Sequence, residues 1–242
     1  MTEAIGQAVI LVGGLGTRLR ELTENQPKPL LPVGGRPFLE WLLDNLARQG
    51  VNNVVLAIGH QAEVFLRWMA RLESPLVIET FIEREPLGTG GALPLMRDQL
   101  EDSFFVLNGD TLFDASLHRV EKTLLESRKL VSVALRRVPD TARYGRVRLD
   151  GTDVVAFAEK SEGGAGIING GIYAVRREAI DRLETPSSIK TDLLPALVLE
   201  GALSGVVDEG FFIDIGLPET YQQAQTIVPE WWREKLGANT NR

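Results

Sequence analysis

Short apolar runs with the length and composition of β-strands recur along the chain. Each holds four to six residues and is rich in Val, Ile, Leu or Phe, a pattern that predicts buried strands. The runs are Ala8–Val12, Val54–Ile58, Leu76–Phe81, Phe104–Leu107, Val131–Leu135, Val154–Phe157 and Ile172–Val175.

Segments of helical length and spacing separate these runs. The clearest extends from Pro37 to Gln49, where apolar residues recur at helical spacing, Pro37 suits a first helical position and Gly50 follows as a terminator. The other expected helices are Ala62–Leu72, Gly91–Asp98, Leu117–Ser127, Asp192–Glu200 and Glu219–Ile227. Alternating strands and helices in the first half predict an α/β fold with a mostly parallel sheet.

The second half adds strands with a different connection. Arg146–Leu149 and Val154–Phe157 flank Asp150-Gly151 as in a hairpin, which predicts antiparallel additions to the parallel half. The sequence shows no linker and no internal repeat. We therefore expect one domain over 1–242, with a core of about 8–228 and a frayed tail from 237 to 242.

Composition restricts the class of ligand. The formal net charge of −7 and the absence of a Lys/Arg-rich run argue against nucleic-acid binding, which needs a clustered basic surface. The chain has no cysteine, which excludes disulfides and thiolate nucleophiles. No segment has the pattern of a secretory signal or a membrane span, so a cytoplasmic protein without membrane contact is expected. Small-molecule phosphates are the expected ligands.

A glycine-rich turn follows the first strand. Gly13, Gly14 and Gly16 allow a close backbone approach and aim N–H groups at an anion. The segment lacks the Gly-Lys-Ser/Thr of a P-loop, and Leu19 stands where a dinucleotide fingerprint has its third glycine. An ordinary tight turn is the competing interpretation.

Charged residues near this turn favour a phosphate site. Arg18 closes it, and Lys28 stands between Pro27 and Pro29, which restrict the backbone that presents the ammonium group. Further along, Asp110 follows the strand Phe104–Leu107, where α/β sheets place their ligands, although an aspartate there is often only a turn former.

The order of these motifs resembles the nucleotidyltransferases that activate sugar 1-phosphates, and the resemblance runs from Ala8 to about Tyr221. The matching segments are Gly13–Leu19, Pro27–Pro32, Gly35–Pro37, Glu85–Ala92, Asn108–Asp110, Glu159–Lys160, Asn169–Tyr173 and Asp214–Gly216. The resemblance implies a Rossmann-like open, mostly parallel sheet flanked by helices. The details of two segments, Val12–Gly16 and Pro86–Gly91, are most like guanylyltransferases acting on D-glycero-D-manno-heptose 1-phosphate.

The resemblance also assigns roles to residues. The implied catalytic residues are Arg18, Lys28, Asp110 and Asp214, and the two aspartates are the implied ligands of Mg²⁺. The implied nucleotide-binding residues are Leu11, Gly13, Gly14, Gly16, Thr17, Arg18, Lys28, Glu85, Gly88, Thr89 and Gly90. The implied sugar-phosphate-binding residues are Asn108, Gly109, Glu159, Lys160, Asn169 and Gly170.

The implied reaction joins a nucleoside triphosphate, with GTP expected, to a sugar 1-phosphate and releases pyrophosphate. Mannose-1-phosphate guanylyltransferase and N-acetylmuramate-1-phosphate uridylyltransferase share the same loops and stay open. A catalytically silent sugar-nucleotide-binding regulatory subunit is a further alternative, disfavoured by the joint presence of Arg18, Lys28, Asp110 and Asp214. A glycosyltransferase is disfavoured because Thr111 and Leu112 follow Asp110 where an Asp-x-Asp motif would be needed. Trp231 and Trp232 are expected to pack against the core or a second subunit, so a homo-oligomer is one expected state.

Overall fold

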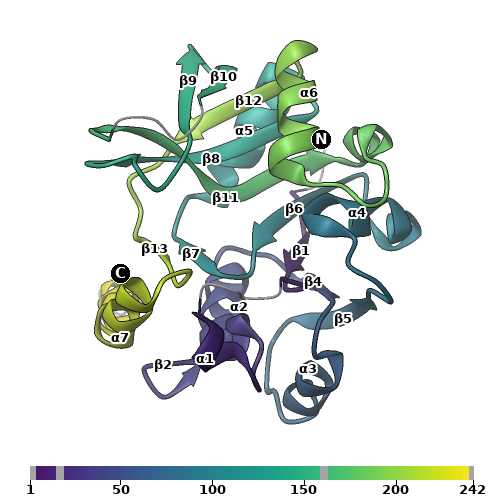
Figure 1. The fold of residues 1–242 in the computed structure, drawn as a ribbon. Coiled ribbons are helices and arrows are strands. Elements are labelled where there is room, and N and C mark those ends of the chain that lie inside the picture. Colours follow the sequence, from purple (N-terminus) through teal and green to yellow (C-terminus); the bar gives the residue numbers. More distant parts are fainter. Residues whose placement is uncertain (1–3, 15–18, 159–162, 240–242) are drawn as a thin grey trace.

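The computed structural model describes residues 4–14, 19–158 and 163–239, and a nine-stranded sheet forms its centre (Figure 1). The order of the strands across the sheet is β5-β4-β1-β6-β11-β8-β12-β10-β9. They are β1 Gln7–Leu11, β4 Asn53–Ile58, β5 Val77–Ile82, β6 Ser103–Asn108, β8 Val131–Val138, β9 Arg146–Asp150, β10 Asp153–Ala158, β11 Gly166–Arg176 and β12 Leu203–Val207.

The strand directions confirm the mostly parallel sheet with antiparallel additions. Strands β5, β4, β1 and β6 run parallel to one another. Strand β11 is antiparallel to both β6 and β8, and the hairpin of β9 and β10 turns at Gly151, whose φ of 59° suits glycine. Strand β12 was not among the expected strands, and it pairs in parallel with β8.

Two further pairs of short strands lie outside this sheet. Strands β7 (Thr111–Phe113) and β13 (Phe212–Asp214) form one antiparallel ribbon, and β2 (Pro32–Val33) and β3 (Arg36–Pro37) form the other. Figure 1 shows β7 and β13 side by side, to the left of β1 and near α7.

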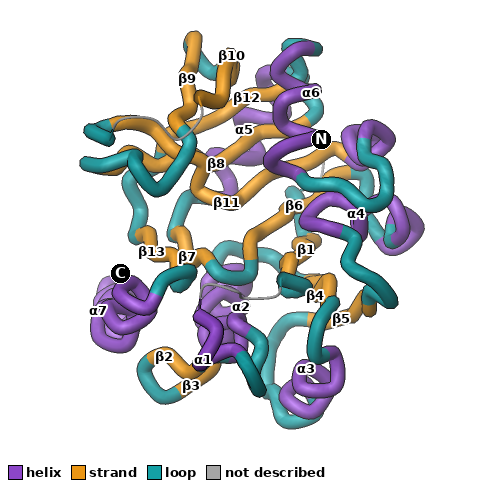
Figure 2. The backbone as a smooth tube through the Cα atoms, viewed as in Figure 1, coloured by secondary structure: helices purple, strands orange, loops and turns teal. Residues whose placement is uncertain are grey.

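Helices cover both faces of the sheet, and Figure 2 shows them distributed around the strands. Successive residues of β1 alternate between two hydrophobic cores, with Ala8 and Ile10 in one and Val9 in the other. The first core also receives side chains from α2, α3, α5 and α7, and the second from α4 and α6. Their bounds are α2 Phe38–Arg48, α3 Ala62–Met69, α4 Gly88–Leu95, α5 Leu117–Ser127, α6 Leu194–Leu199 and α7 Pro218–Asn239.

Most expected helices are present, with shifted ends. Helix α2 begins after Pro37, which precedes the helix rather than opening it, and α4 begins at Gly88 instead of Gly91. A π-helical turn, η5 (Ile189–Leu193), precedes α6. The remaining short elements are α1 Arg20–Thr23, η2 Lys28–Leu30, η3 Arg97–Gln99 and η4 Arg177–Arg182.

Helix α7 continues well past Ile227, where it was expected to end. It covers the first residues of the predicted tail and reaches Asn239, while residues 240–242 lie outside the described ranges. Trp231 stacks on Phe211 with ring centroids 4.9 Å apart, and Trp232 meets Trp41 edge to face at 6.2 Å. The two tryptophans therefore fasten this helix to the core. Within the described ranges, no helix is long and apolar enough to cross a membrane.

Candidate active site

A cavity of about 930 Å³ opens where several strands end. Residues at the carboxyl ends of β1, β5 and β6 form one wall of the cavity. Residues of β11 and β13 form the opposite wall. The predicted site residues that line it are Leu11, Gly13, Gly14, Lys28, Gly88, Thr89, Asn108, Gly109, Asp110, Asn169, Gly170 and Asp214. Most of the predicted site residues that the structure describes are thus brought together in one place.

Asp110 occupies the turn between β6 and β7. The N–H of Gly109 donates to the carbonyl of Leu11 at 3.0 Å, which ties this turn to the end of β1. A Cβ on Gly109 would lie 2.7 Å from that carbonyl oxygen, so the close approach requires glycine. The Lys28 ammonium donates to Asp110 Oδ2 at 2.8 Å. The segment that presents Lys28, which was predicted to serve a phosphate, thus also brings the ammonium group to the Asp110 carboxylate.

Asp214 reaches the same cavity from the other end of the chain. It is the register partner of Thr111 in the ribbon of β13 and β7, and the N–H of Ile215 donates to the Asp110 carbonyl at 2.9 Å. The N–H of Gly216 donates to Asp214 Oδ1 at 3.1 Å. The ribbon thus places two carboxylates, more than 100 residues apart in sequence, at one cavity.

Asp214 has two side-chain partners that the sequence analysis missed. Arg143 Nη2 lies 3.2 Å from its Oδ1, and the Tyr144 hydroxyl donates to its Oδ2. Burial of Tyr144 and its contact with Asp214 raise the pKa of the phenol above its ordinary value of 10.0. The signal available in the sequence was an Arg-Tyr-Gly triplet in the loop between β8 and β9, which has no core-forming pattern.

The glycine turn after β1 is described only in part. Gly13 and Gly14 line the cavity, whereas Gly16, Thr17 and Arg18 lie outside the described residues. A Cβ on Gly13 would lie 2.9 Å from Glu83 Oε1, so the turn passes close to that carboxylate.

Glu83, the first residue after β5, is a second residue that the sequence analysis missed. It lines the cavity, and burial raises the pKa of its carboxyl group above 4.5, against the opposing effect of a hydrogen bond from the N–H of Leu87. Its position at the carboxyl end of a predicted parallel strand could have identified it. Glu85, which was chosen instead, is exposed and does not line the cavity.

The start of α4 is used partly for packing. Gly88 and Thr89 line the cavity, but Gly90 is buried, and the N–H groups of Gly90 and Gly91 donate to the carbonyl of Ser187 at 2.9 and 3.3 Å. The N–H of Gly90, one of the implied nucleotide-binding residues, is therefore already bonded within the protein.

The opposite wall carries the predicted sugar-phosphate residues that are described. Asn169 donates to the Tyr173 hydroxyl at 2.9 Å and accepts from the N–H of Gly171 at 2.9 Å, which fixes its amide. Burial raises the pKa of Tyr173 to about 12, so the phenol stays protonated. A Cβ on Gly170 would lie 2.5 Å from the Phe113 ring. Glu159 and Lys160 lie outside the described residues.

The donor set fits a magnesium ion whose remaining coordination positions are filled by phosphate oxygens and water. Mg²⁺ is usually held by one or two carboxylates and by substrate phosphates rather than by an all-protein cage. Asp110 and Asp214 supply two such carboxylates, and no group of three or more His, Cys, Asp and Glu that could hold a metal occurs in the described part of the chain.

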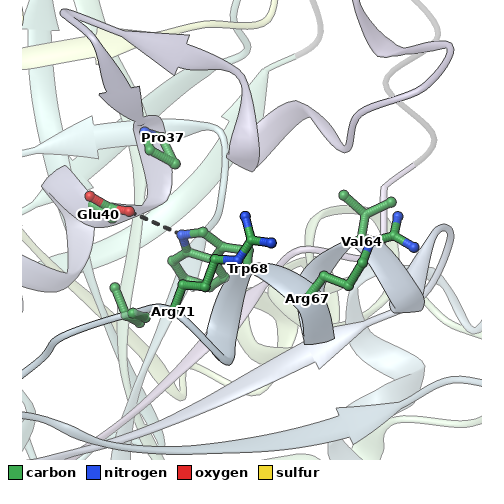
Figure 3. A pocket seen from close by; sticks show the side chains of 7 residues that line it. Pro37, Glu40, Val64, Arg67, Trp68 and Arg71 are labelled. Carbon is green, nitrogen blue, oxygen red and sulfur yellow. Dashed lines mark hydrogen bonds between the residues drawn. The ribbon is translucent and has the colours of Figure 1, made fainter.

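A second hollow lies apart from this cavity, between α2 and α3 (Figure 3). Its volume is about 390 Å³, and the Trp68 indole donates to Glu40 at 3.0 Å across it. Arg67 and Arg71 stand on its α3 side, as Figure 3 shows. Neither carboxylate pairs nor glycine turns gather there among the described residues, so the larger cavity is the candidate active site.

The site lies at the strand ends of an open α/β sheet and combines paired carboxylates, a lysine and a glycine turn. This arrangement is typical of enzymes that bind and transfer nucleotide phosphates. The model of the family described as nucleotidyl transferase matches residues 7–230. The chain belongs to this family, and it is an enzyme of the nucleotidyltransferase type.

Two of the relatives that the chain matches over nearly their whole length carry the same protein name. The chain is 36% identical to D-glycero-alpha-D-manno-heptose 1-phosphate guanylyltransferase of Aneurinibacillus thermoaerophilus, over 90% of this chain and 96% of that protein. It is 38% identical to the Campylobacter jejuni protein of the same name, over 89% and 96% of the two chains. Among solved structures, HddC from Yersinia pseudotuberculosis complexed with GMP-PN superposes with a TM-score of 0.81 at 33% identity, covering 91% of this chain and 98% of HddC.

Proposed function

We propose that the chain transfers GMP from GTP to D-glycero-α-D-manno-heptose 1-phosphate and releases pyrophosphate. The convergence of Asp110, Asp214 and Lys28 on one cavity carries the proposal for the reaction. The heptose 1-phosphate guanylyltransferases support the substrates, because the match covers 96% of their length. We infer a cytoplasmic location, with which the absence of cysteine is compatible because that compartment is reducing.

The chemistry needs little from protein side chains beyond charge and alignment. A sugar-phosphate oxygen attacks the α-phosphorus of GTP, and pyrophosphate leaves in line with it. Because the second pKa of a phosphate monoester is about 6, the nucleophile is largely ionised at pH 7 without a protein base. Lys28 would neutralise phosphate charge, and Asn169 would orient the sugar phosphate. Mg²⁺ held by Asp110 and Asp214 would supply further charge neutralisation when bound.

Glu83 supports guanine as the base. The Watson–Crick edge of guanine presents two adjacent donors, N1–H and the N2 amino group, and one carboxylate can accept from both. Glu83 lines the cavity and lies close to Gly13. Gly13 belongs to the glycine turn that the resemblance assigns to nucleotide binding. Uracil and thymine present one donor between two acceptors, and a carboxylate would repel those acceptors.

Pyrophosphate release from a matrix of substrates tests the proposal. The purified chain is incubated with Mg²⁺, each of GTP, UTP, ATP, CTP and dTTP, and each of a panel of sugar 1-phosphates. We expect the highest kcat/KM for GTP with D-glycero-α-D-manno-heptose 1-phosphate. Release with UTP and N-acetylmuramate 1-phosphate would identify the uridylyltransferase alternative. No release with any pair would indicate a silent sugar-nucleotide-binding subunit.

Mannose 1-phosphate is the second candidate substrate. The chain is 39% identical to the mannose-1-phosphate guanylyltransferase of Mycobacterium tuberculosis, over 88% of this chain. That match covers 62% of the relative. A higher kcat/KM with mannose 1-phosphate than with the heptose 1-phosphate would select this candidate.

A further inference from the structure

The two carboxylates of the candidate site have different cation partners. Lys28 pairs with Asp110 at 2.8 Å, and its side chain is 11% exposed. Arg143 pairs with Asp214 at 3.2 Å, and its side chain is 41% exposed. The lysine side chain is thus largely buried, whereas the arginine side chain is partly exposed to solvent.

Asp214 does not depend on Arg143 for its position. The Tyr144 hydroxyl donates to Oδ2 and the Gly216 N–H donates to Oδ1, so each oxygen has a partner besides the guanidinium. The Tyr144 ring also meets Phe212 edge to face at 6.3 Å, which fixes the phenol. The carboxylate would therefore stay in place if the guanidinium moved away.

The backbone that carries Arg143 is anchored. Asp140 accepts from the N–H groups of Ala142 and Gly164 at 3.0 and 3.1 Å, and these bonds lower the pKa of its carboxyl group. The N–H of Thr141 donates to the Gly164 carbonyl at 3.0 Å. Movement of Arg143 is thus confined to its long side chain, which lines the cavity.

We infer that the Arg143 guanidinium exchanges one partner for another. It neutralises Asp214 in the metal-free protein, and it moves to a phosphate oxygen of a substrate when a divalent ion binds at Asp214. The inference rests on the proposed function, in which that ion binds at Asp214. A divalent ion at the carboxylate repels a guanidinium a few ångströms away, and the phosphates that enter with the ion attract it. Arg143 would then be a substrate-positioning residue that also competes with metal.

Two measurements on Arg143→Gln test the exchange. Mn²⁺ binding to the substrate-free protein is followed by electron paramagnetic resonance, and the KM values for GTP and for the sugar 1-phosphate are determined separately. Arg67→Gln is the matched control, because Arg67 lies on α3 beside the second hollow and loses the same charge. Equal melting temperatures of the three proteins would show that folding is unchanged.

We expect Arg143→Gln to bind Mn²⁺ about two- to fivefold more tightly, the range for an exposed ion pair. We also expect a KM about tenfold higher for the substrate whose phosphate receives the guanidinium, because a charge-assisted hydrogen bond is lost. A change in the KM for GTP alone would show that the guanidinium binds the triphosphate. A change in the KM for the sugar 1-phosphate alone would show that it binds the phosphate monoester.

Unchanged Mn²⁺ affinity of Arg143→Gln, or unchanged KM values for both substrates, would overturn the exchange. Pyrophosphate release by the wild-type protein would in that case still support the proposed function. Absence of both Mn²⁺ binding and pyrophosphate release in the wild type would overturn the proposed function as well.

Discussion

Asp214 and Thr111 are register partners in the short antiparallel ribbon of β13 and β7, so the residue after Asp110 is held directly opposite Asp214. This pairing, with the hydrogen bond from Ile215 to the Asp110 carbonyl, sets the two carboxylates at one cavity. A ladder of three residue pairs therefore assembles the site from two distant segments.

Lys28 should be needed for turnover more than for folding. In Lys28→Met the apolar part of the side chain is retained, so the melting temperature should shift by only a few degrees, whereas loss of the ammonium should lower kcat/KM about 10²- to 10³-fold. Pyrophosphate release and thermal unfolding check the two effects. A kcat/KM within threefold of wild type would leave Lys28 a structural role.

Glu83→Gln should weaken the preference for guanine. The amide can accept from one N–H of guanine but its own NH₂ group opposes the second, so kcat/KM for GTP should fall by about 10-fold or more. Inosine triphosphate lacks the N2 amino group and serves as the comparison. We expect wild type to favour GTP over ITP and the variant to lose most of this difference; an equal GTP/ITP ratio in both proteins would remove Glu83 from base recognition.

Glu83 should also make stability depend on pH. Burial raises the pKa of its carboxyl group above 4.5 in the folded chain, so folding favours the protonated acid. Its ionisation lowers the free energy of unfolding as pH rises from 4.5 through the raised pKa. Glu83→Gln should therefore be more stable than wild type at pH 7, with the difference shrinking below pH 4.5. Urea unfolding at both pH values measures this, and a variant less stable at pH 7 would contradict it.

Gly109→Ala should lower both stability and activity. The added Cβ would lie 2.7 Å from the Leu11 carbonyl oxygen, and the backbone there cannot yield without moving Asp110, so we expect a loss of about 1–3 kcal/mol. Gly237→Ala in helix α7 is the control, because a Cβ meets nothing within 4 Å there and alanine favours a helix by about 0.5–1 kcal/mol. Equal melting temperatures for Gly109→Ala and wild type would contradict the close approach.

Much of the fold could be predicted because its strands are continuous apolar runs. The strands around β1 are buried on both sides, and helices such as α5, predicted to the residue at Leu117–Ser127, have a clear apolar face. The missed strand β12 contains Ser204 and Gly205 and is less apolar than the others. Helix α7 extends beyond the predicted end at Ile227, because it continues through Pro229, a residue type that usually interrupts helices, and buries Trp231.

The residues of the candidate site could be predicted where they stand within one of the sequence motifs that the chain shares with the nucleotidyltransferases. Lys28, Asp110 and Asn169 line the cavity as expected. Glu83 could have been found from its position at the end of a predicted strand, whereas Arg143 could not, because its place depends on which loops the sheet order brings together. The sheet order follows from tertiary packing, which a local pattern does not contain.

A double-mutant cycle on Asp110 and Asp214 tests the central claim, that both carboxylates serve one divalent ion, most directly. Pyrophosphate release from GTP and the sugar 1-phosphate is measured for Asp110→Asn, Asp214→Asn and the double variant, each with unchanged melting behaviour. Each single variant should lose more than about 100-fold in kcat, because losing even an outer partner of a metal site costs 10–100-fold. Residues acting as one unit are strongly non-additive, so the double variant should be only a few-fold slower than either single variant. Losses that multiply in the double variant, or a single variant with wild-type turnover, would contradict the shared ion.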